Sequence, residues 1–285
     1  LTTSSAASDV YKRQINGITD WVYEEEFGFV RAFDWSQDSN QIVYMRFDES
    51  NVPIFSMDVY GNQTYPFPYM FRYPKAGEEN SKIELIIYNT SSQTKETIDF
   101  ENETPYYIPR IQFIGGRHSL IIQTLNRHQN KLKLWRWNTK KKNLQLLLTE
   151  QDEAYVSIND DLKFIEDDGF LWTSEKDGYR HIYHFDKDGR FINQVTQGDW
   201  EVTTIYNYNP KSKEIYFQSV EGSSIERGIY AIDISGRGKR KLQPTHGFNG
   251  ATFSNNNSYY IHSYSDELTP PISVSYTHLT LPTRL

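Results

Sequence analysis

One short stretch decides the fold: Tyr208-Asn-Pro-Lys-Ser-Lys-Glu-Ile-Tyr-Phe217. It joins a polar turn to a hydrophobic strand rich in β-branched and aromatic residues, which is the pattern of a β-hairpin. The same combination recurs along the chain, and its later copies begin roughly 44 to 51 residues apart. The other copies are residues 35–44, 113–122, 164–172 and 253–261. A repeat of this length predicts one supersecondary unit per copy.

Second hairpins are expected between these copies. They occupy residues 181–192 and 228–239, where Asp188-Gly189 and Ser235-Gly236 are expected to supply the positive φ angles of tight turns. Two hairpins in each repeat of about 45 residues correspond to one four-stranded propeller blade. Helix patterns are nearly absent. The sequence therefore predicts an all-β fold, a partial β-propeller of about five blades in whole or part.

Composition agrees with a folded β protein and excludes some partners. Of the 285 residues, 15% are aromatic, 37% are hydrophobic and 24% are charged. Aromatic side chains suit a half-buried sheet surface. The net charge of −7 and the absence of a basic stripe among the aromatic residues argue against nucleic-acid binding. The run Lys140-Lys141-Lys142 is interpreted as a solvated hairpin turn.

Cysteine is absent, which excludes disulfides, thiolate catalysis and cysteine-based zinc sites. No apolar run of the length of a membrane span occurs, and the N-terminus lacks the apolar core of a signal peptide. Any export signal of a parent protein would lie outside this chain.

Both ends differ from the organisation between them. SSAASDVYKRQ at residues 4–14 and VSYTHLTLPTRL at residues 274–285 resemble peptides translated from sequencing-adapter DNA. Native tails are the alternative interpretation. Residues 1–14 and 273–285 are expected to be foreign, and His278 is then without functional meaning. The native part, residues 15–272, is expected to be a fragment of a longer protein.

Several polar groups are weighed as sites and set aside. His181 and His184 lie three apart on an expected strand, but no third ligand accompanies them, so strand histidines are favoured over a metal pair. Asp186 opens half of a calcium loop, but Gln197 stands where the closing glutamate is needed, so a hairpin turn is favoured. The orientations of Arg110, Arg127 and Asn126 stay open. The aromatic-rich residues 48–81 break the repeat and are interpreted either as a functional long loop or as a packed aromatic loop.

The most specific motif is Asp20-Trp-Val-Tyr-Glu-Glu-Glu26, which lies in an aromatic setting. Successive side chains of a helix point about 100° apart, so two adjacent carboxylates are expected to converge only from a short, irregular turn. Carboxylates crowded together repel unless a cation lies between them, and an ammonium group suits such a pair. A solvated acidic turn is the alternative that composition alone favours.

This motif is similar to the double-glutamate motif of the dipeptidyl peptidase IV family in the prolyl oligopeptidase clan. Further segments resemble the family in the same order and extend the similarity from about Ile15 to Pro271. These segments are residues 32–39, 47–53, 73–80, 172–183 and 198–202. The resemblance implies that Glu25 and Glu26 bind the free α-amino group of peptide substrates. It also implies a larger, eight-bladed propeller and an extracytoplasmic parent protein, in the periplasm or at the cell surface.

The same resemblance implies that the catalytic groups lie elsewhere. The family carries its Ser-Asp-His triad in a following α/β-hydrolase domain with a Gly-x-Ser-x-Gly elbow, and that pattern does not occur in this sequence. No catalytic residue, metal or cofactor is assigned here. The expected role is the substrate-gating, amine-anchoring propeller of a serine exopeptidase that releases Xaa-Pro and Xaa-Ala dipeptides. The parent is expected to contain the hydrolase domain and to form a homodimer. The alternative is a stand-alone TolB-like propeller that binds proteins.

Overall fold

The structure is a computed structural model that describes residues 13–100, 103–114, 119–165 and 169–276. Most of the two expected foreign tails, His278 and the turn residues of two repeats therefore lie outside the described residues. The chain divides into two compact units, residues 1–158 and 159–285. Within the described ranges, no helix is both long and apolar enough to cross a membrane.

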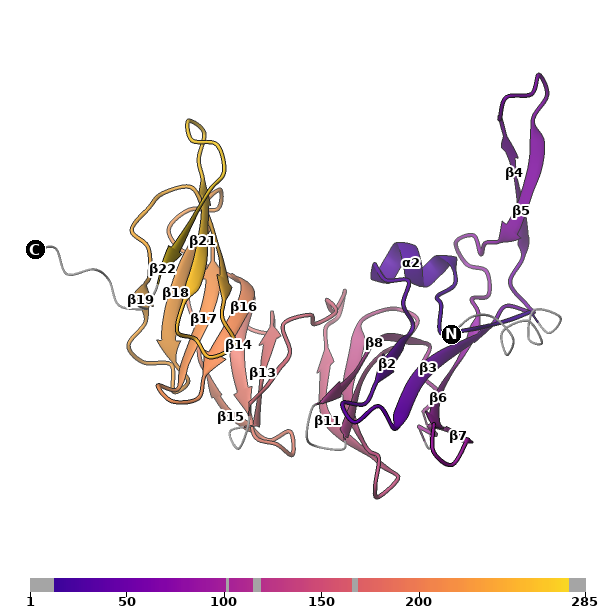
Figure 1. Cartoon of the computed structure of the whole chain (residues 1–285), viewed down its shortest axis with the longest axis horizontal. Coiled ribbons are helices and arrows are strands. Elements are labelled where there is room, and N and C mark those ends of the chain that lie inside the picture. Colours follow the sequence, from indigo (N-terminus) through magenta and orange to yellow (C-terminus); the bar gives the residue numbers. More distant parts are fainter. Residues whose placement is uncertain (1–12, 101–102, 115–118, 166–168, 277–285) are drawn as a thin grey trace, which may run out of the picture. The chain divides into compact units, whose positions relative to one another are not determined.

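Unit 1 contains two antiparallel sheets of the blade type, drawn from indigo to rose in Figure 1. The first has the order β1-β3-β6-β7, and a further strand, β2, also pairs with β3. Its strands are β1 (Gln14–Asn16), β2 (Phe33–Trp35), β3 (Gln41–Asp48), β6 (Lys82–Asn89) and β7 (Thr94–Thr97). The second has the order β11-β10-β9-β8. Its strands are β8 (Tyr107–Ile114), β9 (Ser119–Leu125), β10 (Lys131–Asn138) and β11 (Asn143–Gln151).

Unit 2 contains three antiparallel sheets with strands in chain order. The first holds β12 (Lys163–Ile165), β13 (Gly169–Ser174), β14 (His181–Phe185) and β15 (Phe191–Gln194). The second holds β16 (Val202–Asn209), β17 (Glu214–Ser219), β18 (Gly228–Asp233) and β19 (Arg240–Lys241). The third holds β20 (Phe248–Phe253), β21 (Tyr260–Ser265) and β22 (Ile272–Tyr276).

The predicted fold class is confirmed: the chain is an all-β, partial propeller of successive antiparallel sheets. Every repeat copy named above falls on an antiparallel pair of consecutive strands. The pairs are β2–β3, β8–β9, β12–β13, β16–β17 and β20–β21. In each of these pairs the two strands follow one another along the chain. One turn and its flanking strand were therefore enough to indicate each hairpin. The Lys140–Lys142 run closes the β10–β11 hairpin, as expected.

Apolar packing in unit 2 joins its first two sheets into one core. β13 is buried along its whole length, which explains its continuous run of apolar and aromatic residues. The cluster consists of Ile165, Leu171, Ile182, Val195, Val202, Ile205, Ile215, Phe217, Tyr230, Ile232 and Ile234. Trp172 and Tyr216 are also fully buried in this unit.

The tight turns differ from the prediction in one respect. Gly189 has a φ of 88°, but Asp188 does not adopt positive φ. The side chain of Asp186 explains this, because its Oδ1 accepts the backbone N–H groups of Asp188 (2.8 Å) and Arg190 (2.9 Å). These two bonds lower the pKa of Asp186. At Ser235-Gly236 the glycine likewise takes the positive φ alone, so only the second residue of each predicted pair has this role.

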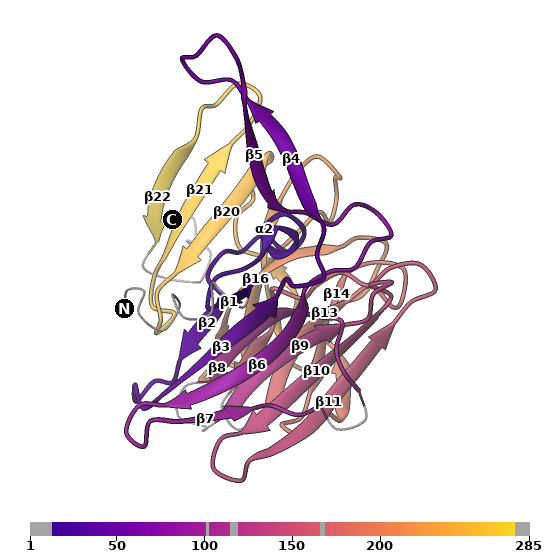
Figure 2. The same cartoon turned by 90° about the vertical axis from the view of Figure 1, so that its right-hand side faces the viewer.

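Residues 48–81 contain a hairpin that projects from the rest of unit 1 (Figures 1 and 2). Its strands are β4 (Ile54–Val59) and β5 (Phe67–Arg72). Rings on one side pack together, with 5.8 Å between the centroids of Phe55 and Phe71. Several large apolar side chains stay exposed: Ile54, Met57, Tyr60, Tyr65, Phe67, Tyr69 and Met70. The aromatic packing that the sequence suggested is therefore present on part of the hairpin.

Candidate functional site

The predicted site lies on an insertion between two strand segments. β1 and β2 both pair with β3, and residues 17–32 leave the sheet between them. The base of the insertion closes on Met45, whose carbonyl accepts the N–H of Gly17 and whose N–H donates to Ala32, both at 2.9 Å. Above the base, the N–H of Thr19 donates to the carbonyl of Val30 at 3.1 Å. The sheet therefore fixes both ends of the insertion.

Within the insertion, residues Trp21–Phe27 form the helix α2 (Figure 1). Asp20 caps its N-terminus by accepting the N–H of Tyr23 at 3.0 Å. The other carboxylate oxygen of Asp20 accepts the hydroxyl of Ser81 at 2.5 Å. Burial raises the pKa of Asp20, and these hydrogen bonds oppose the rise. Asp20 therefore fixes the start of α2 to a residue distant in the sequence.

The buried face of α2 centres on Tyr23. Its ring packs edge-on against Phe27 (4.9 Å between centroids) and Phe47 (4.8 Å). Its hydroxyl accepts the N–H of Ile108 on β8 at 2.9 Å. Burial raises the pKa of Tyr23 well above its ordinary value, which keeps the phenol neutral. This side chain attaches α2 to both sheets of unit 1.

The exposed face of α2 carries Glu24, Glu25 and Glu26. Among the described residues, no hydrogen bond or ion pair is found for the carboxylates of Glu25 and Glu26. The expectation of an irregular turn was wrong, because both glutamates lie in a regular helical segment that ends at Gly28 with a φ of 69°. A helix this short that buries only one narrow face leaves three consecutive side chains free to reach solvent.

One of the polar residues left open above contacts the helix. Arg110 on β8 donates to the carbonyl of Phe27 at 2.9 Å. Arg127 lies over the ring of Tyr106, with 5.0 Å to its centroid. Asn126 points into its own turn, where its side chain accepts the N–H groups of residues 130 and 131. Of the three polar residues whose orientation the sequence left open, only Arg110 is found bonded to α2.

Tyr107 is a site neighbour that sequence reasoning missed. Its hydroxyl accepts a hydrogen bond from the side chain of Asn80 at 2.8 Å, and its ring packs edge-on against Phe27. Burial raises the pKa of Tyr107, and the negative charge of Glu26 adds to the rise. The pair Tyr106-Tyr107 at the start of β8 gave no periodic signal, so only the folded structure relates it to α2.

The histidines set aside above have structural partners. Nδ1 of His181 lies 3.0 Å from the hydroxyl of Thr196, and Nε2 lies 2.9 Å from the carbonyl of Gly198. Both ring nitrogens therefore bond the segment that follows β15. The described ranges contain no group of three or more His, Asp or Glu side chains that could hold a metal ion.

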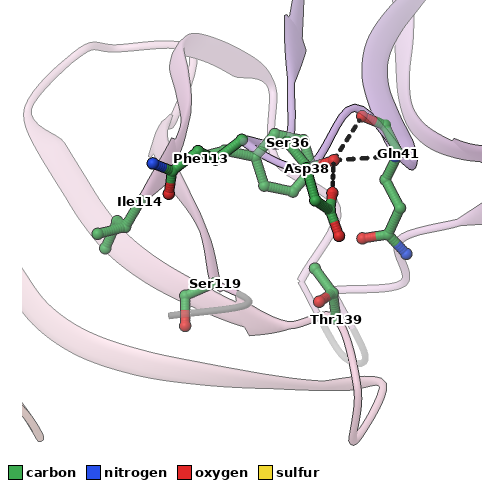
Figure 3. A pocket seen from close by; sticks show the side chains of 8 residues that line it. Ser36, Asp38, Gln41, Phe113, Ile114, Ser119 and Thr139 are labelled. Atoms are coloured by element: carbon green, nitrogen blue, oxygen red, sulfur yellow. Dashed lines mark hydrogen bonds between the residues drawn. The ribbon is translucent and has the colours of Figure 1, made fainter. Parts of the chain in front are cut away.

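A cavity of about 200 Å³ lies at the turn between β2 and β3 (Figure 3). Its polar groups bond one another: the hydroxyl of Ser36 donates to Asp38 at 2.7 Å and accepts the N–H of Gln41 at 2.9 Å. The bonds from Ser36 and Asn40 lower the pKa of Asp38 to about 2. These groups stabilise the turn, so the cavity is a weaker candidate site than α2.

Comparison with known proteins identifies the family. The family model for the dipeptidyl peptidase IV (DPP IV) N-terminal region matches residues 2–271. The chain belongs to this family. A solved structure of Porphyromonas gingivalis dipeptidyl peptidase 4 is 39% identical, with a TM-score of 0.85 over 93% of this chain. A second, of a putative dipeptidyl aminopeptidase IV from Bacteroides ovatus, is 25% identical with a TM-score of 0.79, also over 93% of this chain.

Curated relatives agree with this assignment to the DPP IV N-terminal region. Dipeptidyl peptidase 4 of Trichophyton equinum is 28% identical over 94% of this chain and 36% of its own length. The Porphyromonas and Bacteroides structures are covered over 38% and 40% of their chains. The chain therefore spans about a third of the length of the curated relatives it matches. The resemblance carried by residues 20–26 and the other segments is confirmed, whereas the domain boundaries stay predictions.

Unit 1 also contains a carboxyl group whose pKa is raised to near neutrality. Burial raises the pKa of Glu49 to about 7, the charge of Asp20 adds to the rise, and Arg72 opposes it. The ordinary value is 4.5, so between these two pH values the folded chain holds a proton that the unfolded chain releases. The free energy of unfolding should therefore fall as pH rises through this window.

Glu49→Gln removes this titration. Above pH 7 the variant should melt about 1–3 °C higher than the unchanged protein, a modest shift because Glu49 is only half-buried. Thermal unfolding at intervals from pH 5 to 8 measures the effect, and exposed Glu79→Gln is the matched control. Identical pH slopes for Glu49→Gln and the unchanged protein would show that Glu49 does not titrate in this range.

Proposed function

We propose that this chain is the substrate-gating and amine-anchoring region of a serine exopeptidase that releases Xaa-Pro and Xaa-Ala dipeptides. In this proposal Glu25 and Glu26 bind the α-ammonium group of the peptide. The observation that carries it is a pair of exposed carboxylates with no hydrogen bond or ion pair to any residue that the structure describes, on a helix held at its start by Asp20 and on its buried face by Tyr23. Side chains so presented are available to a ligand.

An ammonium group matches two carboxylates in charge and in hydrogen bonding. Its three N–H donors are enough for both side chains, whose flexible stems would have to turn toward one another from adjacent helical positions, and such charge-assisted bonds are stronger than neutral ones. The cation also relieves the repulsion between Glu25 and Glu26. A peptide whose amine is blocked or internal loses these contacts, so the site selects a free N-terminus.

The cleavage itself is assigned to the α/β-hydrolase domain proposed to follow in the parent chain. The distance from the anchored amine to the serine nucleophile would then set the length of the released product. Binding energy gained at the amine would orient the scissile bond, which lowers the barrier to attack. A stand-alone binding propeller is not favoured, because the relatives named above are dipeptidyl peptidases and a dipeptidyl aminopeptidase.

The free amine is the feature to test. The full-length protein encoded by the parent gene should hydrolyse Gly-Pro-p-nitroanilide at least about 100-fold faster than its N-acetylated form, because acetylation removes the positive charge. Release of p-nitroaniline measures both rates. Equal rates would contradict amine anchoring, and a parent gene that stops before a Gly-x-Ser-x-Gly segment would contradict the peptidase assignment.

A further inference from the structure

The helix α2 is too short to be stable by itself. Helices of fewer than about 12 residues are marginal in water, because the first turn fixes several residues for one hydrogen bond. Contacts with the rest of unit 1 must therefore hold α2 in place. Asp20 holds its start and Tyr23 holds its buried face. The ring of Tyr23 packs on Phe27 in the last turn, but the side-chain hydrogen bonds of Asp20 and Tyr23 described above lie outside that turn, in which Glu25 and Glu26 lie.

The last turn has a partner on β8. Nη1 of Arg110 lies 2.9 Å from the carbonyl oxygen of Phe27 and 2.8 Å from that of Pro109. The guanidinium group also lies over the ring of Phe29, with 5.6 Å to its centroid. One nitrogen thus bridges the end of α2 to the strand, and the ring of Phe29 limits where the guanidinium can move.

Charge explains why a cation belongs here. The last carbonyls of a helix lack intrahelical donors and form the negative end of its dipole. Glu25 and Glu26 add two negative charges to the same turn. A positive group bonded to the carbonyl of Phe27 satisfies an orphan acceptor and lowers the electrostatic cost of presenting both carboxylates.

We infer that Arg110 is a positioning residue that fixes the last turn of α2 and thereby the direction in which Glu25 and Glu26 point. This inference rests on the proposed function. Arg110 acts through the helix and is assigned no contact with substrate. Asp20 and Tyr23 hold the first turn and the buried face independently, so loss of Arg110 should loosen the last turn and leave the fold intact.

Kinetics of the full-length protein test the inference. Arg110→Met should raise KM for Gly-Pro-p-nitroanilide about tenfold and change kcat by less than twofold, because the chemical groups are untouched. Arg110→Lys keeps the charge and should recover part of the loss. Arg31→Met is the matched control: Arg31 also donates to a backbone carbonyl, of Phe33 at 3.2 Å, and lies over that ring at 4.6 Å. Its side-chain contacts within the described ranges are to Phe33 and Asp34 and not to α2. The KM of the Arg31→Met protein should stay unchanged.

Hydrogen exchange separates positioning from general destabilisation. In Arg110→Met the backbone amides of residues 24–28 should exchange faster, whereas the amide of Ile108, bonded to Tyr23, should keep its protection. Unchanged exchange in α2, or an unchanged KM in Arg110→Met, would overturn the inference. Should Arg110→Met fail to fold, an Arg110→Lys protein with unchanged KM and exchange would overturn it as well.

The two hypotheses fail differently. If Glu25→Gln lowers kcat/KM while Arg110→Met behaves as the unchanged protein, only the positioning role is wrong. If Glu25→Gln itself has no effect, amine anchoring is wrong and the role of Arg110 loses its basis.

Discussion

Replacement of Glu25 or Glu26 by glutamine in the full-length protein is expected to lower kcat/KM for Gly-Pro-p-nitroanilide by about 100-fold. Glutamine keeps the size of the side chain but removes the negative charge that binds the ammonium group. A hydrogen bond to a charged group contributes about 1.5–3 kcal/mol, and 2.7 kcal/mol corresponds to about 100-fold in rate. Both side chains are exposed, so the free energy of unfolding should change little.

Glu24→Gln is the matched control, because Glu24 precedes the pair on the same helix and is also exposed. Its kcat/KM should stay within about twofold of the unchanged protein. The double variant Glu25→Gln/Glu26→Gln should lose less than the product of the two single losses, since both carboxylates bind one amine. Near-normal hydrolysis by either single variant, or an equal loss with Glu24→Gln, would refute the anchoring role.

The strands were predictable because their signals are local. Each hairpin has two local signals. One is a turn residue that either accepts positive φ or closes the turn through its side chain, and the other is a hydrophobic strand beside that turn. At residues 35–44, 208–217 and 253–261 the paired strands are also neighbours in sequence. A short window therefore contained both the turn and its partner strands, and the period of about 45 residues supplied the number of sheets.

The helix was not predictable in the same way. Residues 21–27 show no helical period of useful length, and their three glutamates suggested a turn. Contacts from distant residues hold this segment helical. Ser81 lies 61 residues from Asp20, Ile108 lies 85 from Tyr23, and Arg110 lies 83 from Phe27. Such pairs leave no pattern within a short window, so Arg110 and Tyr107 could not be assigned from sequence.

The candidate glutamates came from a motif, and the structure added their surroundings. The motif identified which carboxylates to consider, but it contained nothing on how they are presented. The capped helix, its buried Tyr23 and two carboxylates without a bonded partner in the described ranges are what the proposed amine anchor would need. A site whose parts lie in one heptapeptide can thus depend on residues more than 80 positions away.

Removal of the Tyr23 ring should have the largest effect on stability. Tyr23→Ala is expected to destabilise unit 1 by about 3–5 kcal/mol, the usual cost of truncating a large buried aromatic residue. The side chain is 3% exposed and packs against Phe27, Phe47 and Tyr107. Tyr23→Phe keeps the ring but leaves the N–H of Ile108 without its acceptor, so a destabilisation of about 1–3 kcal/mol is expected.

Urea unfolding of the 285-residue chain, followed by hydrogen exchange of β8 and α2, measures these losses and assigns them to unit 1. Tyr60→Ala is the control, because Tyr60 is 75% exposed and its loss should cost no more than about 0.5 kcal/mol. A Tyr23→Ala loss below 1 kcal/mol would mean that the Tyr23 contacts do not hold α2. The loss of stability should be largest for Tyr23→Ala, smaller for Tyr23→Phe and smallest for Tyr60→Ala. This order is expected because the ring supplies most of the attachment and the hydroxyl adds one hydrogen bond. Since that attachment presents Glu25 and Glu26, Tyr23→Ala should also remove the preference of the full-length protein for a free amine.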